Sequence, residues 1–165
     1  MFTPNLKRNT IFTSIFCIYF LYSTLSIAQN QKVDSLILAF GVENNLQKRF
    51  ELIKNILSNL DQNYDRSRVI EYYKAGLQIA EETENFLEFG KWSIELFEIY
   101  KLDPNDENEG LSLMKHAKSH IQEVSNNRVR GIIYLKLAAA HYSKTEFTKA
   151  IEAYSMAELE FSEND

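Results

Sequence analysis

Two apolar segments over residues 131–161 alternate large and small side chains in a fixed order. The residues that form this order are Tyr134, Leu137, Ala138, Phe147, Ala150, Tyr154 and Ala157. Bulky side chains fill the space between paired helices, and methyl-sized ones let their backbones approach. This order is typical of a helical hairpin that stacks on copies of itself. We therefore expect a repeat protein, whose scaffold presents a surface to a partner and usually carries out no chemistry.

The rest of the chain also reads as helical. It has only two prolines and five glycines in 165 residues, and apolar residues recur at spacings of three and four throughout. We expect seven helices and no strand. The first five are marked by the apolar residues within 36–40, 50–60, 69–84, 86–100 and 111–124, and the hairpin described above supplies the last two. Polar turns at residues 61–65 and 125–127, and the Asp103-Pro104 pair, separate them.

A repeat emerges when the second helix of each hairpin is compared with the others. The blocks 69–76, 110–117 and 150–157 each place a large residue four positions after a small or β-branched one and a small residue seven positions after it. Gly76 occupies the last of these positions in the first block. A glycine inside a helix costs about 1 kcal/mol relative to alanine, so we expect a close approach there to offset the cost.

Residues 1–28 have the pattern of a secretory signal peptide. Lys7 and Arg8 precede an uncharged apolar run over residues 11–27, and Ser26 and Ala28 are small residues at the two places that signal peptidase reads. We expect cleavage after Ala28 and export to the periplasm or the medium. The alternative is an uncleaved anchor in the inner membrane, because 17 apolar residues approach the roughly 20 that span a bilayer.

The segment after Ala28 is acidic and contains no cysteine. It holds all 23 acidic residues and 16 of the 18 basic ones, so its formal charge is 16 minus 23, or −7. This balance argues against nucleic acid or anionic lipid as a partner, since both select clusters of Lys and Arg. Contact with a membrane is expected only if the signal segment remains uncleaved. Stability must come from packing alone, without disulfides.

The last hairpin resembles a tetratricopeptide repeat, in which aromatic, leucine and small residues follow in the order given above. The second hairpin fits through Leu96, Phe97, Tyr100, Gly110, Met114 and Ala117, and the first more loosely through Ile56, Leu57, Leu60, Val69, Tyr73 and Gly76. The resemblance implies an all-α, right-handed α-solenoid of about three hairpins, over residues 46–84, 85–126 and 128–162, preceded by a short helix and linker at 29–45. The period of about 40 residues exceeds the usual 34, which keeps HEAT-like packing as an alternative.

The arrangement also resembles the exported N-terminal region of bacterial tetratricopeptide signalling proteins, in which a signal peptide and a short helix precede the repeats. Residues 33–36, Val-Asp-Ser-Leu, occupy the corresponding place. Two interpretations follow: a lone protein-interaction scaffold, and a truncated sensory segment of a signal-transduction receptor. The sequence has no polar capping helix after the last hairpin, so self-association through that hairpin is a third expectation.

In the resembling family the first helix of each hairpin lines a concave groove that binds a peptide or protein. Carried over to this chain, the groove residues are Lys54, Ser58, Asp61, Lys91, Ile94, Glu98, Ile132, Leu135, Ala139 and Tyr142. The last four are apolar. They could contact a partner, or be covered by a further repeat or by the curvature of the array.

Few residues suggest catalytic chemistry. His116 and His120 lie four apart on a predicted helix, with Glu123 three further on, which is compatible with a metal site. The segment between the histidines lacks the glutamate of the HExxH motif, so a metal-dependent hydrolase is only the third function class, and two solvated histidines are the simpler interpretation. Residues 103–107 resemble a calcium loop but lack its glycine and its final glutamate. We expect no enzymatic activity, no cofactor and no metal.

Overall fold

The computed structural model describes residues 31–60 and 65–162. The predicted signal peptide and the groove residue Asp61 lie outside these ranges. Within them the chain is all-helical and contains the seven expected α-helices, with no strand. The first covers residues 31–42; the others are α2 (Leu46–Asn59), α3 (Arg66–Glu82), α4 (Phe86–Tyr100), α5 (Glu107–Ser119), α6 (Asn127–Ser143) and α7 (Phe147–Ser162), and a 3-10 turn, η1 (Pro104–Asp106), precedes α5.

Short polar side chains determine where the helices begin. Asn45, Asp65, Asn85 and Asn126 cap α2, α3, α4 and α6, and each side chain accepts a hydrogen bond from a backbone N–H in the first turn. These bonds satisfy donors that have no partner within the helix. The polar residue that precedes each of these four helices therefore also caps it.

Two of the turns use left-handed backbone at residues other than glycine. Glu84, between α3 and α4, has φ 54°, and Thr145, between α6 and α7, has φ 58°. In both turns the following N–H reaches back to a carbonyl five residues earlier, from Asn85 to Ala80 and from Glu146 to His141. This is the hydrogen bond that closes a helix before a sharp change of direction.

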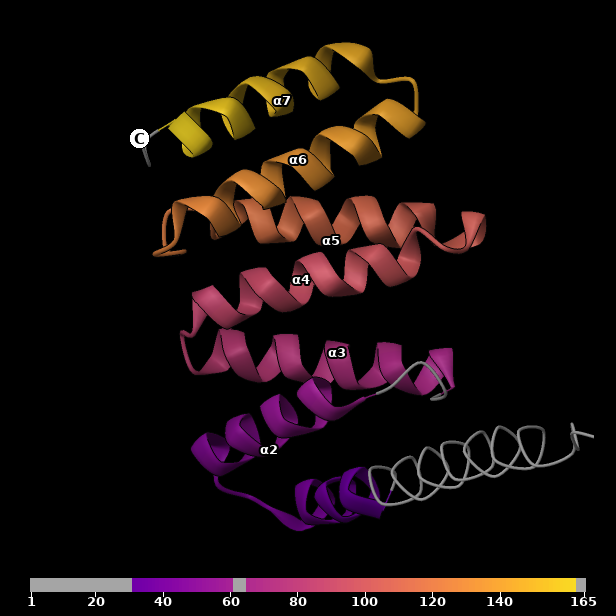
Figure 1. Cartoon of the computed structure of the whole chain (residues 1–165), viewed down its shortest axis with the longest axis vertical. Helices are drawn as coiled ribbons and strands as arrows, with labels where there is room; N and C mark the ends of the chain where they lie inside the picture. The colour runs from indigo at the N-terminus through magenta and orange to yellow at the C-terminus, as the bar shows by residue number, and fades with distance from the viewer. Residues whose placement is uncertain (1–30, 61–64, 163–165) are drawn as a thin grey trace, which may run out of the picture.

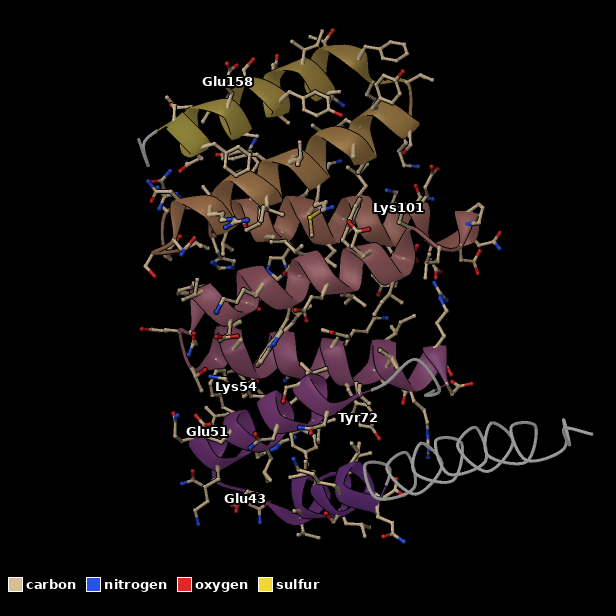
Figure 2. All side chains as sticks on the ribbon, viewed as in Figure 1. Glu43, Glu51, Lys54, Tyr72, Lys101 and Glu158 are labelled. Atoms are coloured by element: carbon tan, nitrogen blue, oxygen red, sulfur yellow. The ribbon has the colours of Figure 1, made fainter. Side chains whose placement is uncertain are left out.

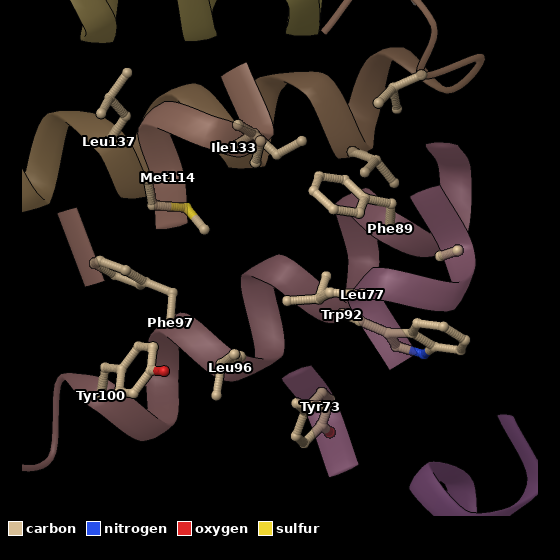
Figure 3. Packing of buried hydrophobic residues seen from close by; sticks show 14 of the residues in the cluster. Tyr73, Leu77, Phe89, Trp92, Leu96, Phe97, Tyr100, Met114, Ile133 and Leu137 are labelled. Atoms are coloured by element: carbon tan, nitrogen blue, oxygen red, sulfur yellow. The ribbon is translucent and has the colours of Figure 1, made fainter. Parts of the chain in front are cut away.

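The helices pack as a stack in which each contacts its neighbours in sequence, and α4 also contacts α6 (Figure 1). The buried side chains form one continuous core along the stack. In Figure 3, the side chain of Met114 of α5 extends into the space between α4 and α6, with Ile133 and Leu137 of α6 above it and Phe97 of α4 below it. Every helix thus buries an apolar face against the next one, as expected for a helical repeat.

The small residues of the repeated blocks are buried, and the surroundings of Gly76 explain why that position lacks a side chain. A Cβ added at Gly76 would lie 3.1 Å from Cδ1 of Leu57 and 3.2 Å from Cε3 of Trp92. The close approach expected at Gly76 is real, but the groups that approach are side chains of α2 and α4. The small residues of the other two blocks, Gly110, Ala117, Ala150 and Ala157, are also buried.

The large residues of the blocks differ from one another in burial. Tyr73 and Met114 are buried, whereas Tyr154 is 43% exposed and Phe147 is 53% exposed. Tyr73 lies against α4, where its hydroxyl donates to Glu95 at 2.8 Å and burial raises its pKa. Among the described residues, α7 packs mainly against α6. The order of residue types predicted that Phe147 and Tyr154 would fill the space between helices, but both remain exposed.

The fifth helix ends earlier than the apolar pattern predicts. We expected it to reach Val124, but α5 ends at Ser119 and residues 120–123 form turns. Ile121 and Val124 are still buried, which is why they continue the pattern. Arg130 of α6 donates to the carbonyl of Val124 at 2.9 Å and to Glu160 of α7 at 2.7 Å, and so fixes this non-helical segment.

The helix over residues 31–42 belongs to the fold. Val33 is completely buried, and Lys32 donates to Asn59 of α2 at 3.1 Å. The Val-Asp-Ser-Leu segment therefore contributes an apolar contact to the start of the stack.

Candidate functional site

The predicted groove residues lie on three helices, α2, α4 and α6. Lys54 and Ser58 of α2 are exposed, and Lys54 projects from the N-terminal part of the stack (Figure 2). On α4 and α6 the half-buried members are Lys91, Ile94, Glu98, Ile132 and Ala139. Leu135 and Tyr142 are exposed, by 38% and 61%.

The structure brings the α4 and α6 parts of this set together. Glu98 of α4 forms an ion pair with Lys136 of α6, a residue that the sequence analysis did not select. Lys91 pairs with Glu88 one turn earlier on α4, at 3.0 Å. These pairs neutralise much of the charge on the α4–α6 face, which leaves the apolar side chains of α6 as its distinctive feature.

Exposed apolar side chains are frequent on α6 and α7. Six of them, which we call the α6–α7 apolar surface, are Leu135, Tyr142, Phe147, Ile151, Tyr154 and Phe161. Two contacts join the helices across it: the rings of Tyr142 and Phe147 meet edge to face, 5.5 Å apart, and the ring of Phe161 lies directly over Gly131. Glu158, exposed on α7 (Figure 2), lies one turn after Tyr154 on the same side of the helix.

The sequence analysis identified only the α6 half of this surface. The four α7 residues follow at spacings of four, three and seven, which is a helical stripe. Phe147 and Tyr154 were expected to fill the space between helices because their residue types match positions of the tetratricopeptide pattern that the sequence resembles, whereas Ile151 and Phe161 were assigned no role. Their exposure depends on the absence of a helix packed over them, which residue types do not encode.

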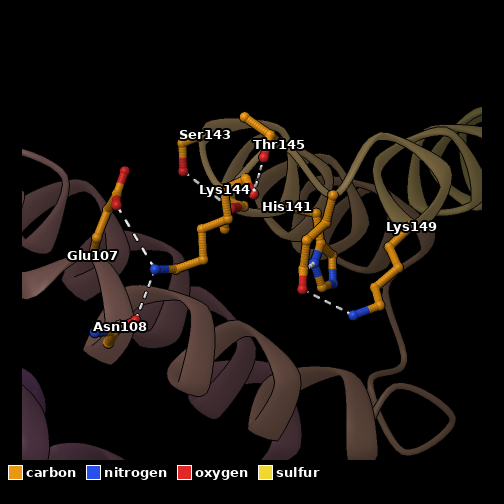
Figure 4. A network of polar contacts seen from close by, with 9 residues as sticks. Glu107, Asn108, His141, Ser143, Lys144, Thr145 and Lys149 are labelled. Atoms are coloured by element: carbon orange, nitrogen blue, oxygen red, sulfur yellow. Dashed lines mark hydrogen bonds and ion pairs between the residues drawn. The ribbon is translucent and has the colours of Figure 1, made fainter.

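A polar network holds the turn between α6 and α7 against α5. Lys144 donates to Asn108 at 2.7 Å and lies 3.7 Å from Glu107, so the end of α6 is tied to the start of α5 (Figure 4). Glu146 contacts both Lys149, at 3.0 Å, and the buried His141, at 2.5 Å. Hydrogen bonds from Lys149 and then His141 lower the pKa of the Glu146 carboxyl. The loop at one end of the α6–α7 apolar surface is therefore fixed.

An open hollow of about 680 Å³ lies where α5, α6 and α7 meet. Tyr134, Leu137 and His141 of α6 line it, together with Lys118 of α5 and, from α7, Lys149, Ile151, Glu152, Ala153, Ser155 and Met156. Its residues were not selected from the sequence, because they come from three helices and share no spacing.

The two histidines that the sequence analysis weighed do lie together. Nε2 of His116 and Nε2 of His120 are each 3.1 Å from Oε1 of Glu81, near the end of α3. The carboxylate beside the pair is thus Glu81 and not Glu123, which was proposed from its spacing along one helix. Sequence spacing cannot reveal a partner 35 residues earlier.

The segment that resembled a calcium loop is a helix start. Asp103 accepts hydrogen bonds from the backbone N–H of Asn105, at 3.0 Å, and from its side chain, at 2.9 Å. The backbone bond is the main cause of the lowered pKa of Asp103. Asp106 pairs with Arg66 at the start of α3. These carboxylates are engaged in capping and ion pairing, as expected near a helix N-terminus.

Within residues 31–60 and 65–162, no helix has the combination of length and apolar character that crossing a bilayer requires. The predicted signal segment and the alternative membrane anchor at residues 11–27 lie outside the described residues. Searches of family models, of curated proteins and of solved structures give no match to this chain.

Proposed function

We propose that this protein is an exported, non-enzymatic scaffold that binds a protein or peptide through an array of tetratricopeptide-like hairpins. The proposal includes a right-handed solenoid whose first helices, α2, α4 and α6, line the concave side. The contacts of α4 with both α5 and α6 support it, since a hairpin array requires such a second neighbour.

The observation that carries the proposal is the α6–α7 apolar surface. Six large apolar side chains are exposed on two packed helices, and Ile151 and Tyr142 are 64% and 61% exposed. Clustered exposed apolar side chains are typical of a protein-interaction site, whereas isolated ones are normal on any surface. Aromatic residues supply much of the binding energy at such interfaces.

The composition of the surface favours a partner with apolar side chains and a basic group. Glu158 lies among the aromatic residues of α7, and the segment after Ala28 carries a formal charge of −7. A basic side chain on the partner would pair with Glu158 and would be attracted by the net charge of the domain.

Photo-crosslinking tests this surface directly. A photoreactive phenylalanine analogue replaces Ile151 in the full chain, and the matched control carries it at Leu102, which is also an exposed apolar residue but lies after α4. We expect discrete crosslinked products at position 151 that are missing at position 102. Crosslinking at neither position, or equally at both, would contradict the proposal.

A pair of variants measures the contribution of the surface to binding. Tyr142→Ser and Ile151→Ser together, in a chain without the photoreactive residue, should weaken binding of the partner that crosslinking identifies at least about tenfold, since the few dominant contacts at the centre of an interface contribute more than about 1 kcal/mol each. Leu102→Ser should leave binding unchanged. Sedimentation at several concentrations then distinguishes a second copy of the chain from another protein.

Export is tested on the same material. Cleavage after Ala28 predicts a mature N-terminus at Gln29, which sequencing of the purified protein from the cell envelope or the medium identifies. Recovery from the cytoplasm with an intact N-terminus would contradict this part of the proposal and leave the binding surface untouched.

A further inference from the structure

The cluster of Glu81, His116 and His120 joins two helices that are not neighbours in the stack. Glu81 lies in the last turn of α3, and the two histidines lie at the end of α5. Helix α4 separates the two in sequence, yet one potential ligand atom from each of the three side chains lies within 4.8 Å of the others. Tertiary packing therefore brings the three side chains together, and their spacing along one helix does not account for the cluster.

The distances from the Glu81 carboxylate to the two imidazoles fit a divalent transition metal. Ligands at the usual 2.0–2.1 Å from a tetrahedral zinc ion lie about 3.3 Å from each other. Oε1 of Glu81 is 3.1 Å from each of the two imidazole Nε2 atoms. An ion could replace the direct contacts with small rotations of the side chains. Two imidazoles and one carboxylate are a ligand set that zinc accepts, with water in the fourth position.

Aromatic side chains from α4 hold both imidazoles in place. The ring of Phe86 stacks on His120 at 4.8 Å, and the ring of Phe89 meets the edges of His116 and His120 at 5.2 and 5.4 Å. Phe89 is itself almost completely buried. The histidine rings are therefore packed against the core before any ligand arrives, which lowers the entropy cost of binding.

The site is also open to solvent. The side chains of His116 and Glu81 are 49% and 40% exposed, and that of His120 is 23% exposed. An ion can enter without unfolding of the helices. The third histidine of the chain, His141, is buried and contacts Glu146, so it does not offer a comparable site.

We propose that Glu81, His116 and His120 bind one zinc ion that fastens the end of α3 to the end of α5. Such a link joins two helices that are separated by α4 in sequence and supplements the contacts between adjacent helices. It is independent of the proposed partner-binding surface, which lies on α6 and α7.

Metal titration of the tag-free full chain tests the site. After removal of metals with a chelator, Zn²⁺ is titrated in competition with a chromophoric chelator, and Co²⁺ serves as a spectroscopic probe of four-coordinate geometry. We expect one Zn²⁺ per chain and the visible d–d absorption of four-coordinate Co²⁺. Absence of binding, or preference for Ca²⁺ or Mg²⁺ over Zn²⁺, would overturn the proposal.

Matched variants identify the ligands. Glu81→Ala and His116→Ala should each weaken Zn²⁺ binding at least about tenfold, because even residues that only orient the ligands contribute 10- to 100-fold. Both residues are substantially exposed, so the fold should persist, which circular dichroism checks. Glu82→Ala, the next residue on α3, and Glu123→Ala, the carboxylate suggested by spacing, should bind as the unaltered chain does. Loss of binding in Glu123→Ala with retention in Glu81→Ala would refute the assignment.

Hydrogen exchange tests whether the bound ion joins the end of α3 to the end of α5. Zn²⁺ should slow exchange of the backbone amides around residues 79–85 and 116–121 in the unaltered chain and leave them unaffected in Glu81→Ala. Binding without any slowing of exchange at the end of α3 would show that the ion does not join the two helices.

Discussion

Two buried glycines allow the packing of the hairpins to be measured separately from helix propensity. Gly76 in α3 is the last residue of its repeated block and Gly110 in α5 is the first residue of its block, and both lie inside helices. Replacement by alanine should gain about 1 kcal/mol at either position from propensity alone. Any difference between the two variants therefore reports the space around the added methyl group.

The surroundings of the two positions predict different outcomes. At Gly76 the new Cβ would lie 3.1 Å from Leu57 and 3.2 Å from Trp92, closer than the 3.5–4.0 Å at which carbon atoms attract best. Trp92 is buried and packs against Phe50 at 5.6 Å, so its ring cannot move freely. Overpacking of this kind costs about 1–3 kcal/mol. At Gly110 the nearest atoms, in the ring of Phe97, are 3.4 Å away.

We expect Gly110→Ala to be stabilised by about 0.5–1 kcal/mol and Gly76→Ala to be destabilised by about 1 kcal/mol. The difference of about 2 kcal/mol corresponds to a shift of about 1 M in the urea midpoint, followed by circular dichroism. Equal midpoints for the two variants would refute the claim that Leu57 and Trp92 require a glycine between them.

Two further substitutions test the helix boundaries. Hydrogen bonds, first of all from Ser67, lower the pKa of Asp65, so the stabilising effect of the Asp65 carboxylate is complete above the ordinary pKa of 3.8 and is lost as the pH falls through the lower pKa of the folded state. Asp65→Asn keeps the cap but should make the urea midpoint fall less steeply with decreasing pH below about pH 4. An unchanged slope would contradict this. Thr145→Gly should raise the midpoint, because φ 58° costs a residue other than glycine about 1–2 kcal/mol. Its control, Thr148→Gly inside α7, should lower stability by about 0.3 kcal/mol, the difference in helix propensity between threonine and glycine. A loss at both positions would count against strain at Thr145.

The number of helices and most of their positions could be predicted because the signals are local. Spacings of three and four mark each helix, and a short polar residue such as Asp65 or Asn126 lies at the start of the next. The end of α5 was predicted wrongly because Ile121 and Val124 are buried without being helical. An apolar pattern reports burial, and burial does not require a helix.

The sequence predicted only some of the residues of each candidate site. Leu135 and Tyr142 could be selected because they occupy known positions of one helix, whereas the exposure of Tyr154 depends on what lies beyond α7. For the histidine pair, the spacing of four showed a shared face, but the carboxylate comes from Glu81 on another helix. Features that arise from two separate elements need the tertiary structure.

The ion pairs that join α3 to η1 and α6 to α5 bear on the mechanical behaviour of the stack. Arg66 with Asp106, and Lys144 with Glu107, are placed at the beginning or end of helices, so they restrain the relative movement of the helices that they join. All four side chains are partly solvated, and salt screens such interactions over about 8 Å at physiological ionic strength. The bending stiffness of the array, and with it the range of curvatures it samples, should therefore respond to ionic strength without any change in helix content.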